Sequence, residues 1–331
     1  MRHLLSSKLF LCLGLNLVLT MPLAAKTYII DVLAIFDKTF NDYHASNKNA
    51  RLDPIDKDVL THLEHFYNYS NQVYRYNELD MVLRMEYKGI VNDTKTDHPE
   101  DLLHEIKSAT TGEYKRMKDY QKSEGFDHIT FLIHNRGISQ TDRDGVQCGV
   151  AYNLKPRLIK NPNESTPFMS TMAENSTCLS GETFTHELGH SMGLGHGSVV
   201  NLKMNQPEYP PAVRGLFPYA NGYCEQGKFV TIMSYEMYCK DAKEVQYFSN
   251  PEEDCTPGHK CGDETRKNAR RAIREVREDY SNVRERKNAP GGSDTGLLQQ
   301  KLQDMRKQLQ QIDATYKAIQ ARQQQYQKDL G

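Results

Sequence analysis

The spacing of apolar and polar positions changes along the chain, and the changes predict strands that alternate with helices. Residues 27–36 (TYIIDVLAIF) are β-branched and apolar, which is typical of a buried strand. Residues 81–91 alternate and predict a second strand, and residues 126–133 predict a third. Helices are expected at 53–76, opened by an Asp cap and a first-turn Pro, and at 99–122. This alternation favours an α/β (α+β) fold with a mixed sheet.

The second half of the chain has weaker periodicity. Short strands are expected at 149–154 and 166–173, and residues 197–228 form a loop-like stretch with several prolines. Long irregular loops in compact domains are usually functional. Residues 264–287 have a narrow apolar face among many Arg and Glu side chains, which predicts a helix with a solvated outer face.

The C-terminal part of the chain predicts a separate module. Residues 288–296 (NAPGGSDTG) have the composition of a flexible linker. Residues 297–331 repeat apolar side chains at spacings of three and four, which is typical of a coiled-coil helix. This helix would form a homo-oligomer, bind a partner protein, or fold back on its own domain.

The N-terminus has the pattern of an export signal. Basic residues precede the apolar run Leu9–Thr20, which is too short to span a bilayer, and Leu23–Ala25 offers a small-residue cleavage site. Residues 1–25 are predicted to be a signal peptide, with an uncleaved anchor as the alternative. The mature protein is expected to be secreted, in a periplasm or outside the cell, without a membrane span. The first strand follows at once, so no pro-domain is expected.

Composition narrows the classes of partner. The 331 residues, enough for a sizeable core, carry 42 basic and 43 acidic side chains and a formal charge of −1. This near-neutral charge argues against nucleic acid as the main partner. A mean hydropathy of −0.71 indicates a very polar surface.

Six cysteines remain once Cys12 has left with the predicted signal. An even count in an exported chain predicts disulfides, although the sequence allows many pairings. Pairing between sequence neighbours is expected, which gives Cys148–Cys178, Cys224–Cys239 and Cys255–Cys261. A cysteine zinc cluster is the alternative, but no paired C-x-x-C spacing supports it.

The densest chemical signal is the stretch HELGHSMGLGH. His186 and His190 are four residues apart, so a helix would place both imidazoles on one face, within reach of one ion. Glu187 would project beside that ion and could take a proton from water. Gly193 lies where the helix must end, because glycine adopts the left-handed conformation without steric cost, and the turn would bring His196 back. Three histidines and a water make an open catalytic site, so Zn²⁺ is the predicted cofactor.

A second stretch, TIMSY, follows the proline-rich loop and contains Met233 and Tyr235. Together with the histidine motif it resembles the Met-turn of the metzincin metallopeptidases, where a methionine lies beneath the zinc site. Tyr235 matches a tyrosine that reaches the zinc or the transition-state oxyanion in astacin-like and serralysin-like metzincins. Its alternative role is that of a buried core tyrosine.

The resemblance spans about residues 27–287 and includes weaker elements. Gly149, Val150, Ala151 and Tyr152 match the antiparallel edge strand, which in metzincins binds an extended substrate through its backbone. The YFSNP stretch at 247–251 resembles bacterial reprolysin-like peptidases. The resemblance implies a twisted mixed sheet with helices, a zinc helix and a Met-turn subdomain. It also implies His186, His190 and His196 as zinc ligands, Glu187 as general base and Gly193 as the turn.

Two positions depart from the reprolysin (adamalysin-like) branch, which is the closest match. Gly197 follows the third histidine, where adamalysin-like members have Asp, and Ser234–Tyr235 is closer to serralysins. The expected function is a secreted zinc metalloendopeptidase whose catalytic domain is residues 26–287 and whose substrates are proteins or peptides. The alternatives are a secreted zinc-containing binding or adhesion protein that acts through the coiled coil, and a hydrolase of another substrate.

Overall fold

The computed structural model describes residues 26–45, 52, 55–90, 99–134, 148–152, 169–174, 181–197, 215–235 and 239–287. The predicted signal peptide, linker and coiled-coil helix lie outside these residues. No helix in the described ranges is both long enough and apolar enough to cross a membrane.

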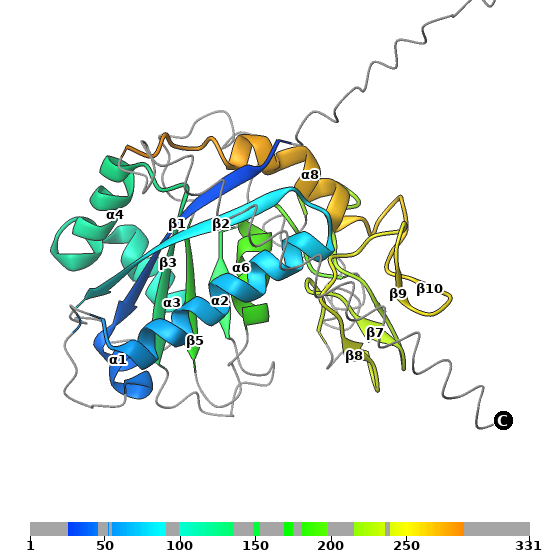
Figure 1. Ribbon diagram of the computed structural model, residues 1–331, viewed down its shortest axis with the longest axis horizontal. Helices are drawn as coiled ribbons and strands as arrows, with labels where there is room; N and C mark the ends of the chain where they lie inside the picture. The colour runs from blue at the N-terminus through cyan, green and yellow to red at the C-terminus, as the bar shows by residue number, and fades with distance from the viewer. Residues whose placement is uncertain are drawn as a thin grey trace, which may run out of the picture.

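A five-stranded mixed sheet organises the first half of the fold, in the order β2-β1-β3-β5-β4 (Figure 1). The strands β2, β1, β3 and β5 run parallel, and β4 pairs antiparallel with β5 at the edge. The mixed sheet expected from the sequence is confirmed. The strands are β1 (Tyr28–Asp37), β2 (Met81–Ile90), β3 (His128–His134), β4 (Gly149–Ala151) and β5 (Met169–Glu174).

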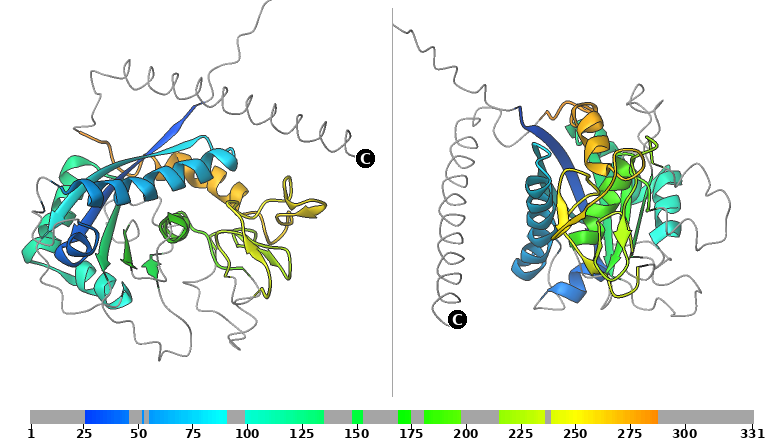
Figure 2. Two further views of the ribbon diagram at one scale, coloured as in Figure 1. Left: turned by 60° about the horizontal axis from the view of Figure 1, so that its bottom comes forward. Right: turned by 90° about the vertical axis from the view of Figure 1, so that its right-hand side faces the viewer.

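Helices cover both faces of this sheet, so the fold has three layers (Figure 2). Ile30 and Val32 of β1 pack into one core with α2, α6 and α8, whereas Leu33 and Ile35 pack into a second core with α3 and α4. Burial on both faces explains why β1 reads as a continuous apolar run. The helices are α1 (Lys38–His44), α2 (Lys57–Tyr76), α3 (Pro99–Ser108), α4 (Gly112–Glu124), α6 (Gly181–Ser191) and α8 (Ala269–Tyr280).

Three helices differ from the sequence prediction. Asp56 caps α2 by accepting a hydrogen bond from the backbone N–H of Asp58, so α2 begins after the expected Asp53–Pro54. The single helix expected at 99–122 is two helices, because the chain is extended at Thr111. Lys118 of α4 donates to the carbonyls of Lys107 and Ala109, and so binds the end of α3.

The helix expected at 264–287 is shorter at both ends. Asn268 caps α8 by accepting a hydrogen bond from the backbone N–H of Arg271. Beyond Tyr280 the chain leaves the helix, and the backbone N–H of Arg284 donates to the carboxylate of Asp127. The residues after Tyr280 therefore pack against the start of β3. The helical spacing of apolar residues in the sequence cannot indicate such a contact.

The second half of the fold has short strands that the sequence pattern did not predict. Two small sheets form, one in the order β6-β7-β8 and one from β9 and β10. Their strands are β6 (Cys224–Glu225), β7 (Phe229–Val230), β8 (Lys243–Glu244), β9 (Asp254–Thr256) and β10 (His259–Lys260).

Candidate metal centre

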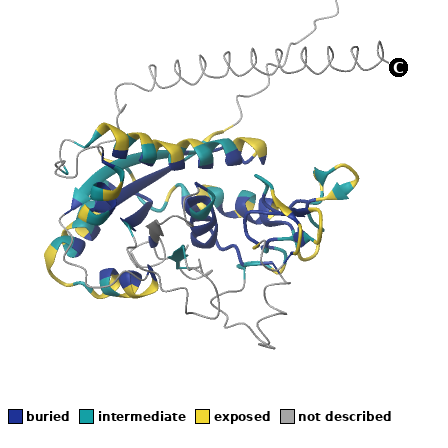
Figure 3. Ribbon diagram, turned by 90° about the horizontal axis from the view of Figure 1, so that it is seen from below, coloured by how far each residue is buried: buried dark blue, intermediate teal, exposed yellow. Residues whose placement is uncertain are grey.

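The helix α6 lies buried between the sheet and the short-stranded region (Figure 3). It packs closely on α2, since a Cβ at Gly181 would lie 2.6 Å from the Cβ of Tyr69. The hydroxyls of Ser70 and Thr185 are hydrogen-bonded at 2.8 Å, and Thr185 also donates to the carbonyl of Gly181. These contacts fix how far α6 is rotated and therefore which side chains it directs away from the sheet.

Three histidine side chains converge beyond this helix. The Nε2 atom of His186 lies 3.1 Å from that of His190 and 3.1 Å from that of His196, and the last two are 2.9 Å apart. They are the group in the described part of the chain whose ligand atoms lie close enough to hold a metal ion. A tetrahedral zinc with bonds of about 2.0–2.1 Å needs nitrogens about 3.3 Å apart, so the donor set fits zinc.

The hydrogen bonds of the rings point to the same conclusion. Nδ1 of His186 lies 2.6 Å from the carbonyl oxygen of Ile232, and Nδ1 of His190 lies 2.8 Å from that of Leu194. A carbonyl only accepts, so each Nδ1 carries the hydrogen and each Nε2 presents a lone pair. Lone pairs that converge repel one another unless a cation lies between them. The arrangement is therefore that of a metal site.

Burial keeps these rings neutral. It lowers the pKa of His186 to about 3, with a smaller contribution from His190, and it lowers the pKa of His190 to about 4. Burial and the two neighbouring imidazoles hold the pKa of His196 well below its ordinary value. Neutral imidazoles are the form that binds a metal.

A tight turn brings His196 to the two helical histidines. Gly193 has a φ of 90°, in the left-handed region. Its N–H donates to the carbonyl of His190, and the N–H of Leu194 donates to that of Gly189, which is the Schellman pattern at a helix end. The turn predicted at Gly193 is therefore present in the structure.

Met233 packs against α6 at Gly189, which lies between His186 and His190 in the sequence. Its side chain is fully buried, and a Cβ at Gly189 would lie 2.6 Å from the sulfur of Met233. The turn is closed by a bond from the N–H of Ser234 to the carbonyl of Thr231. Gly197, where the adamalysin-like pattern has Asp, donates its N–H to the carbonyl of Met233. A backbone hydrogen bond thus joins the third histidine to the Met-turn.

Glu187 follows the first histidine and is 5% exposed. Burial raises the pKa of Glu187 from its ordinary value to about 8. Within the described part of the chain, its Oε2 atom accepts no hydrogen bond. A buried carboxyl of this kind can hold a proton near neutral pH, which is what an acid and base in one reaction cycle must do.

The side chain of Tyr235 also reaches the Nε2 atoms of the histidine cluster. Its hydroxyl lies 2.9 Å from Nε2 of His196 and 3.5 Å from Nε2 of His186, and its ring stacks on His186. The residue is 36% exposed, so the alternative of a buried core tyrosine is wrong. The phenol is placed where it can donate a hydrogen bond to a group held by the histidines.

Three of the four residues predicted as an edge strand form β4, Tyr152 follows it directly, and the residues face two sides. Val150 and Tyr152 pack against the core that contains α3 and α4. Gly149 lies against α6, where a Cβ would meet the side chain of Glu187. At Gly149 the strand therefore presents its backbone, rather than a side chain, to Glu187.

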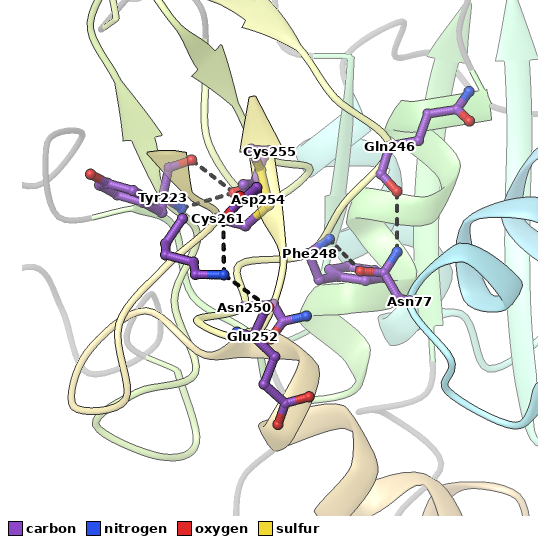
Figure 4. The surroundings of a disulfide bond; sticks show 11 residues. Asn77, Tyr223, Gln246, Phe248, Asn250, Glu252, Asp254, Cys255 and Cys261 are labelled. Atoms are coloured by element: carbon purple, nitrogen blue, oxygen red, sulfur yellow. Dashed lines mark hydrogen bonds and ion pairs between the residues drawn. A yellow bond between two sulfur atoms is a disulfide. The ribbon is translucent and has the colours of Figure 1, made fainter. Parts of the chain in front are cut away.

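Disulfides brace the region around the Met-turn. Cys224 is bonded to Cys239, and Cys255 is bonded to Cys261 (Figure 4), so two of the three predicted pairings are confirmed. Cys148, next to β4, is also disulfide-bonded, and its predicted partner Cys178 lies outside the described residues.

The YFSNP stretch links this region to α2. Asn77 accepts a hydrogen bond from the backbone N–H of Phe248 and donates to the carbonyl of Gln246 (Figure 4). The hydroxyl of Ser249 donates to the carbonyl of Asn221, and it accepts from the N–H of Ala269. The stretch therefore joins α2, the segment before β6 and the start of α8.

Comparison with known proteins agrees with this geometry. Residues 60–197 match the model of a family described as metallo-peptidase family M12B, reprolysin-like. A peptidyl-Asp metalloendopeptidase of Pseudomonas aeruginosa is 24% identical over 301 residues, which cover 87% of this chain and 46% of that protein. The resemblance to metzincin-type zinc metalloproteases is confirmed. The same two findings support the prediction of a zinc metalloendopeptidase.

Two further matches are to a second curated protein and to a solved structure. A serralysin of Photorhabdus sp. (strain Az29) is 29% identical over 119 residues, 33% of this chain and 20% of that protein. The chain thus spans less than half the length of these curated relatives. A solved structure described as a chaperone–substrate complex has a TM-score of 0.54 at 14% identity, over 78% of this chain and 35% of that one, and indicates a shared fold.

Some functional contacts of this metzincin-like site have no signal in the sequence. The carbonyls that orient His186 and His190 belong to Ile232 and Leu194, whose side chains are simply apolar. The close approaches at Gly149 and Gly189 also depend on contacts between distant segments. Only a family alignment or a structure could identify such positions.

Proposed function

We propose that this chain is an exported zinc-dependent endopeptidase. The observation that carries the proposal is the convergence of three Nε2 atoms within 3.1 Å of one another, with Glu187 beside them. His186, His190 and His196 would hold the zinc. When bound, zinc supplies Lewis-acid chemistry, which makes water a better nucleophile and a peptide carbonyl a better electrophile.

Glu187 is the proposed general base and acid. It takes a proton from the attacking water and later gives that proton to the nitrogen of the leaving amine. Its position next in sequence to His186 keeps the carboxyl beside the histidines, and its burial at 5% exposure limits competing contact with solvent.

Tyr235 is proposed to stabilise the transition state. Its hydroxyl, 2.9 Å from Nε2 of His196, is a hydrogen-bond donor next to the place where the scissile carbonyl must lie. A donor held in place before the reaction lowers the barrier, because its orientation costs nothing as negative charge develops on the carbonyl oxygen.

The substrate is proposed to be an extended peptide. Among the described strands, β4 lies at the end of the sheet order and pairs with β5. A peptide added to the other side would form main-chain hydrogen bonds close to Glu187. The name of the P. aeruginosa relative makes peptide bonds beside aspartate the first to examine.

Export is supported by the disulfides. Two complete disulfides and the bonded Cys148 indicate folding in an oxidising compartment. A mature catalytic domain of residues 26–287, a linker and a C-terminal helix that associates with itself or with a partner remain part of the proposal.

The test is digestion of a diverse peptide library by the purified protein, with the fragments identified by mass spectrometry. The protein is compared with Glu187→Ala, which should lose turnover while it still binds one equivalent of zinc. Tyr235→Phe should retain zinc and lose part of the rate. A zinc-loaded protein that cuts nothing, or an active Glu187→Ala variant, would reject the peptidase mechanism. The first result would favour the binding-protein alternative.

A further inference from the structure

The backbone of β4 lies directly on the side chain of Glu187. A Cβ added at Gly149 would lie 2.7 Å from Oε1, 2.8 Å from Cγ and 3.0 Å from Cδ of that glutamate. Real Cβ atoms do not approach other heavy atoms as closely as 2.7 Å, so any larger residue at position 149 would displace Glu187. All three nearest atoms belong to one residue, and that residue is the proposed general base.

The glycine is not needed by the backbone itself. Gly149 is absent from the residues with positive φ, and it pairs in regular antiparallel register with Met172. An alanine could adopt the same backbone conformation at no cost. What the position requires is empty space next to Glu187.

The strand is also unable to move away from the glutamate. Val150 packs into the core with α3 and α4, on the opposite face of β4. The ladder to β5 holds Gly149, Val150 and Ala151 in register. Because one of the close contacts is with Cγ, rotation of the carboxylate alone would not relieve it. The whole side chain of Glu187 would have to change its χ1 rotamer.

We propose that Gly149 is a positioning residue, whose missing side chain determines where the carboxyl of Glu187 lies relative to the three histidines. The inference rests on the proposed peptidase function. It assigns β4 a second role besides binding of substrate backbone: the same strand places the base. Within the described residues, Oε2 of Glu187 accepts no hydrogen bond, and the backbone at Gly149 packs against the same side chain.

The first experiment measures contact, and it needs no activity. Gly149→Ala is made in three backgrounds: the parent, Glu187→Gln and Glu187→Ala, all loaded with zinc. Glutamine has the shape of glutamate, so Gly149→Ala should lower the melting temperature of the parent and of Glu187→Gln by roughly 3–6 °C. In Glu187→Ala the obstructing atoms are gone, and the shift should be under about 1 °C.

A control substitution on the same strand shows whether the effect is specific to the contact with Glu187. Val150→Ala removes packing on the opposite face, so it should lower the melting temperature equally in all three backgrounds. If Gly149→Ala also lowers the melting temperature equally in all three backgrounds, the added Cβ does not clash with Glu187, and the proposal is overturned.

The second experiment measures the consequence for catalysis. A misplacement of about 1 Å in a catalytic group costs about 100-fold in rate, so Gly149→Ala should lower kcat by about that factor. The KM should stay within about threefold and the zinc content should stay at one equivalent, because the atoms nearest to the added Cβ belong to Glu187 and not to a histidine. An unchanged kcat, or a loss confined to KM, would overturn the positioning role.

The two inferences fail separately. A parent that cuts no peptide rejects the peptidase function, and with it a catalytic role for Gly149, even where the melting cycle shows the contact. If the parent cuts peptides but Gly149→Ala lowers the melting temperature equally in all three backgrounds, the peptidase function stands and only the positioning role of Gly149 is rejected.

Discussion

The five-stranded sheet and the segment from Gly195 to Lys267 are stabilised in different ways. The sheet has two strands of ten residues, helices on both faces and a core that contains fully buried side chains such as Phe36 and Leu63. The later segment has strands of two or three residues and two disulfides. Its backbone is held by turns such as Thr231–Ser234.

The candidate metal site lies where these two regions meet. His186 and His190 come from α6, which packs on the sheet layer, whereas His196, Met233 and Tyr235 come from the later segment. The regular half therefore supplies a rigid helix, and the irregular half supplies groups that only a folded loop can bring to it. A bound metal would join the two regions. The following predictions test how much it and other interactions stabilise each region.

Removal of zinc should have the largest effect. A site filled by free zinc at about 10,000 times its Kd stabilises the folded state by about 5.5 kcal/mol, which a chelator would abolish. Amide hydrogen exchange should then rise mainly in residues 215–235, where the Met-turn lies, and little in β1. Chelation of a His196→Ala variant is the control and should change little. A uniform rise in exchange across both regions would mean that the metal does not act at their junction.

Truncation of a side chain in the sheet core should have the second-largest effect. Phe36 is fully buried, so Phe36→Ala should lower the free energy of unfolding by about 4 kcal/mol in urea denaturation. Exchange should rise throughout the sheet while zinc still binds. Tyr76→Ala, at a side chain that is 46% exposed, should cost under about 0.5 kcal/mol. Equal costs at the two positions would show that the sheet core is not what stabilises this half.

Removal of the Cys224–Cys239 disulfide should cost less and act locally. It closes 15 residues, so the double substitution to alanine should cost about 3 kcal/mol, and exchange should rise in residues 224–239 but not in β1. The Cys255–Cys261 pair closes 6 residues and should cost about 2 kcal/mol. A larger loss from the shorter loop would contradict this account of the second region.

The same contrast explains what the sequence could predict. The strands β1 and β3 were visible as apolar runs, because burial on both faces of a sheet leaves a local pattern, whereas β2 was predicted from its alternation. The histidines, Glu187, Gly193 and the methionine turn were visible because their chemistry depends on short spacings. The break between α3 and α4 was missed, although the polar residues 110–112 (TTG) lie there.

Contacts between distant segments left no such pattern. No residue near Gly149 in the sequence indicates that Gly149 packs against the side chain of Glu187. Likewise, no residue near Ile232 indicates that its carbonyl orients His186. Such contacts are properties of the completed fold. For this reason the later segment, which consists mostly of such contacts, could be predicted only in its two disulfides and where it resembles a known family.

A buried histidine between the sheet and α8 gives the smallest predicted effect. His128 on β3 is fully buried, with Nδ1 2.9 Å from the hydroxyl of Tyr280 and Nε2 2.9 Å from that of Ser170. Burial, with a smaller contribution from Arg284, lowers the pKa of His128 from 6.5 to about 3. Between these pH values the unfolded chain binds a proton that the folded chain does not. The stability that His128 contributes is thus complete above pH 6.5 and falls as the pH falls towards 3.

The measurement is the free energy of unfolding of the parent and of His128→Gln at pH 7 and pH 5, with zinc present. From pH 7 to pH 5 the parent should lose about 2 kcal/mol more than the variant. Carboxylates and the other histidines titrate in both proteins, so their contributions cancel in this difference. Leu132→Ala, a core variant without a titrating group, should retain the parent's pH dependence. If His128→Gln does the same, His128 takes up its proton without unfolding, and the contact between the sheet and α8 is open to solvent.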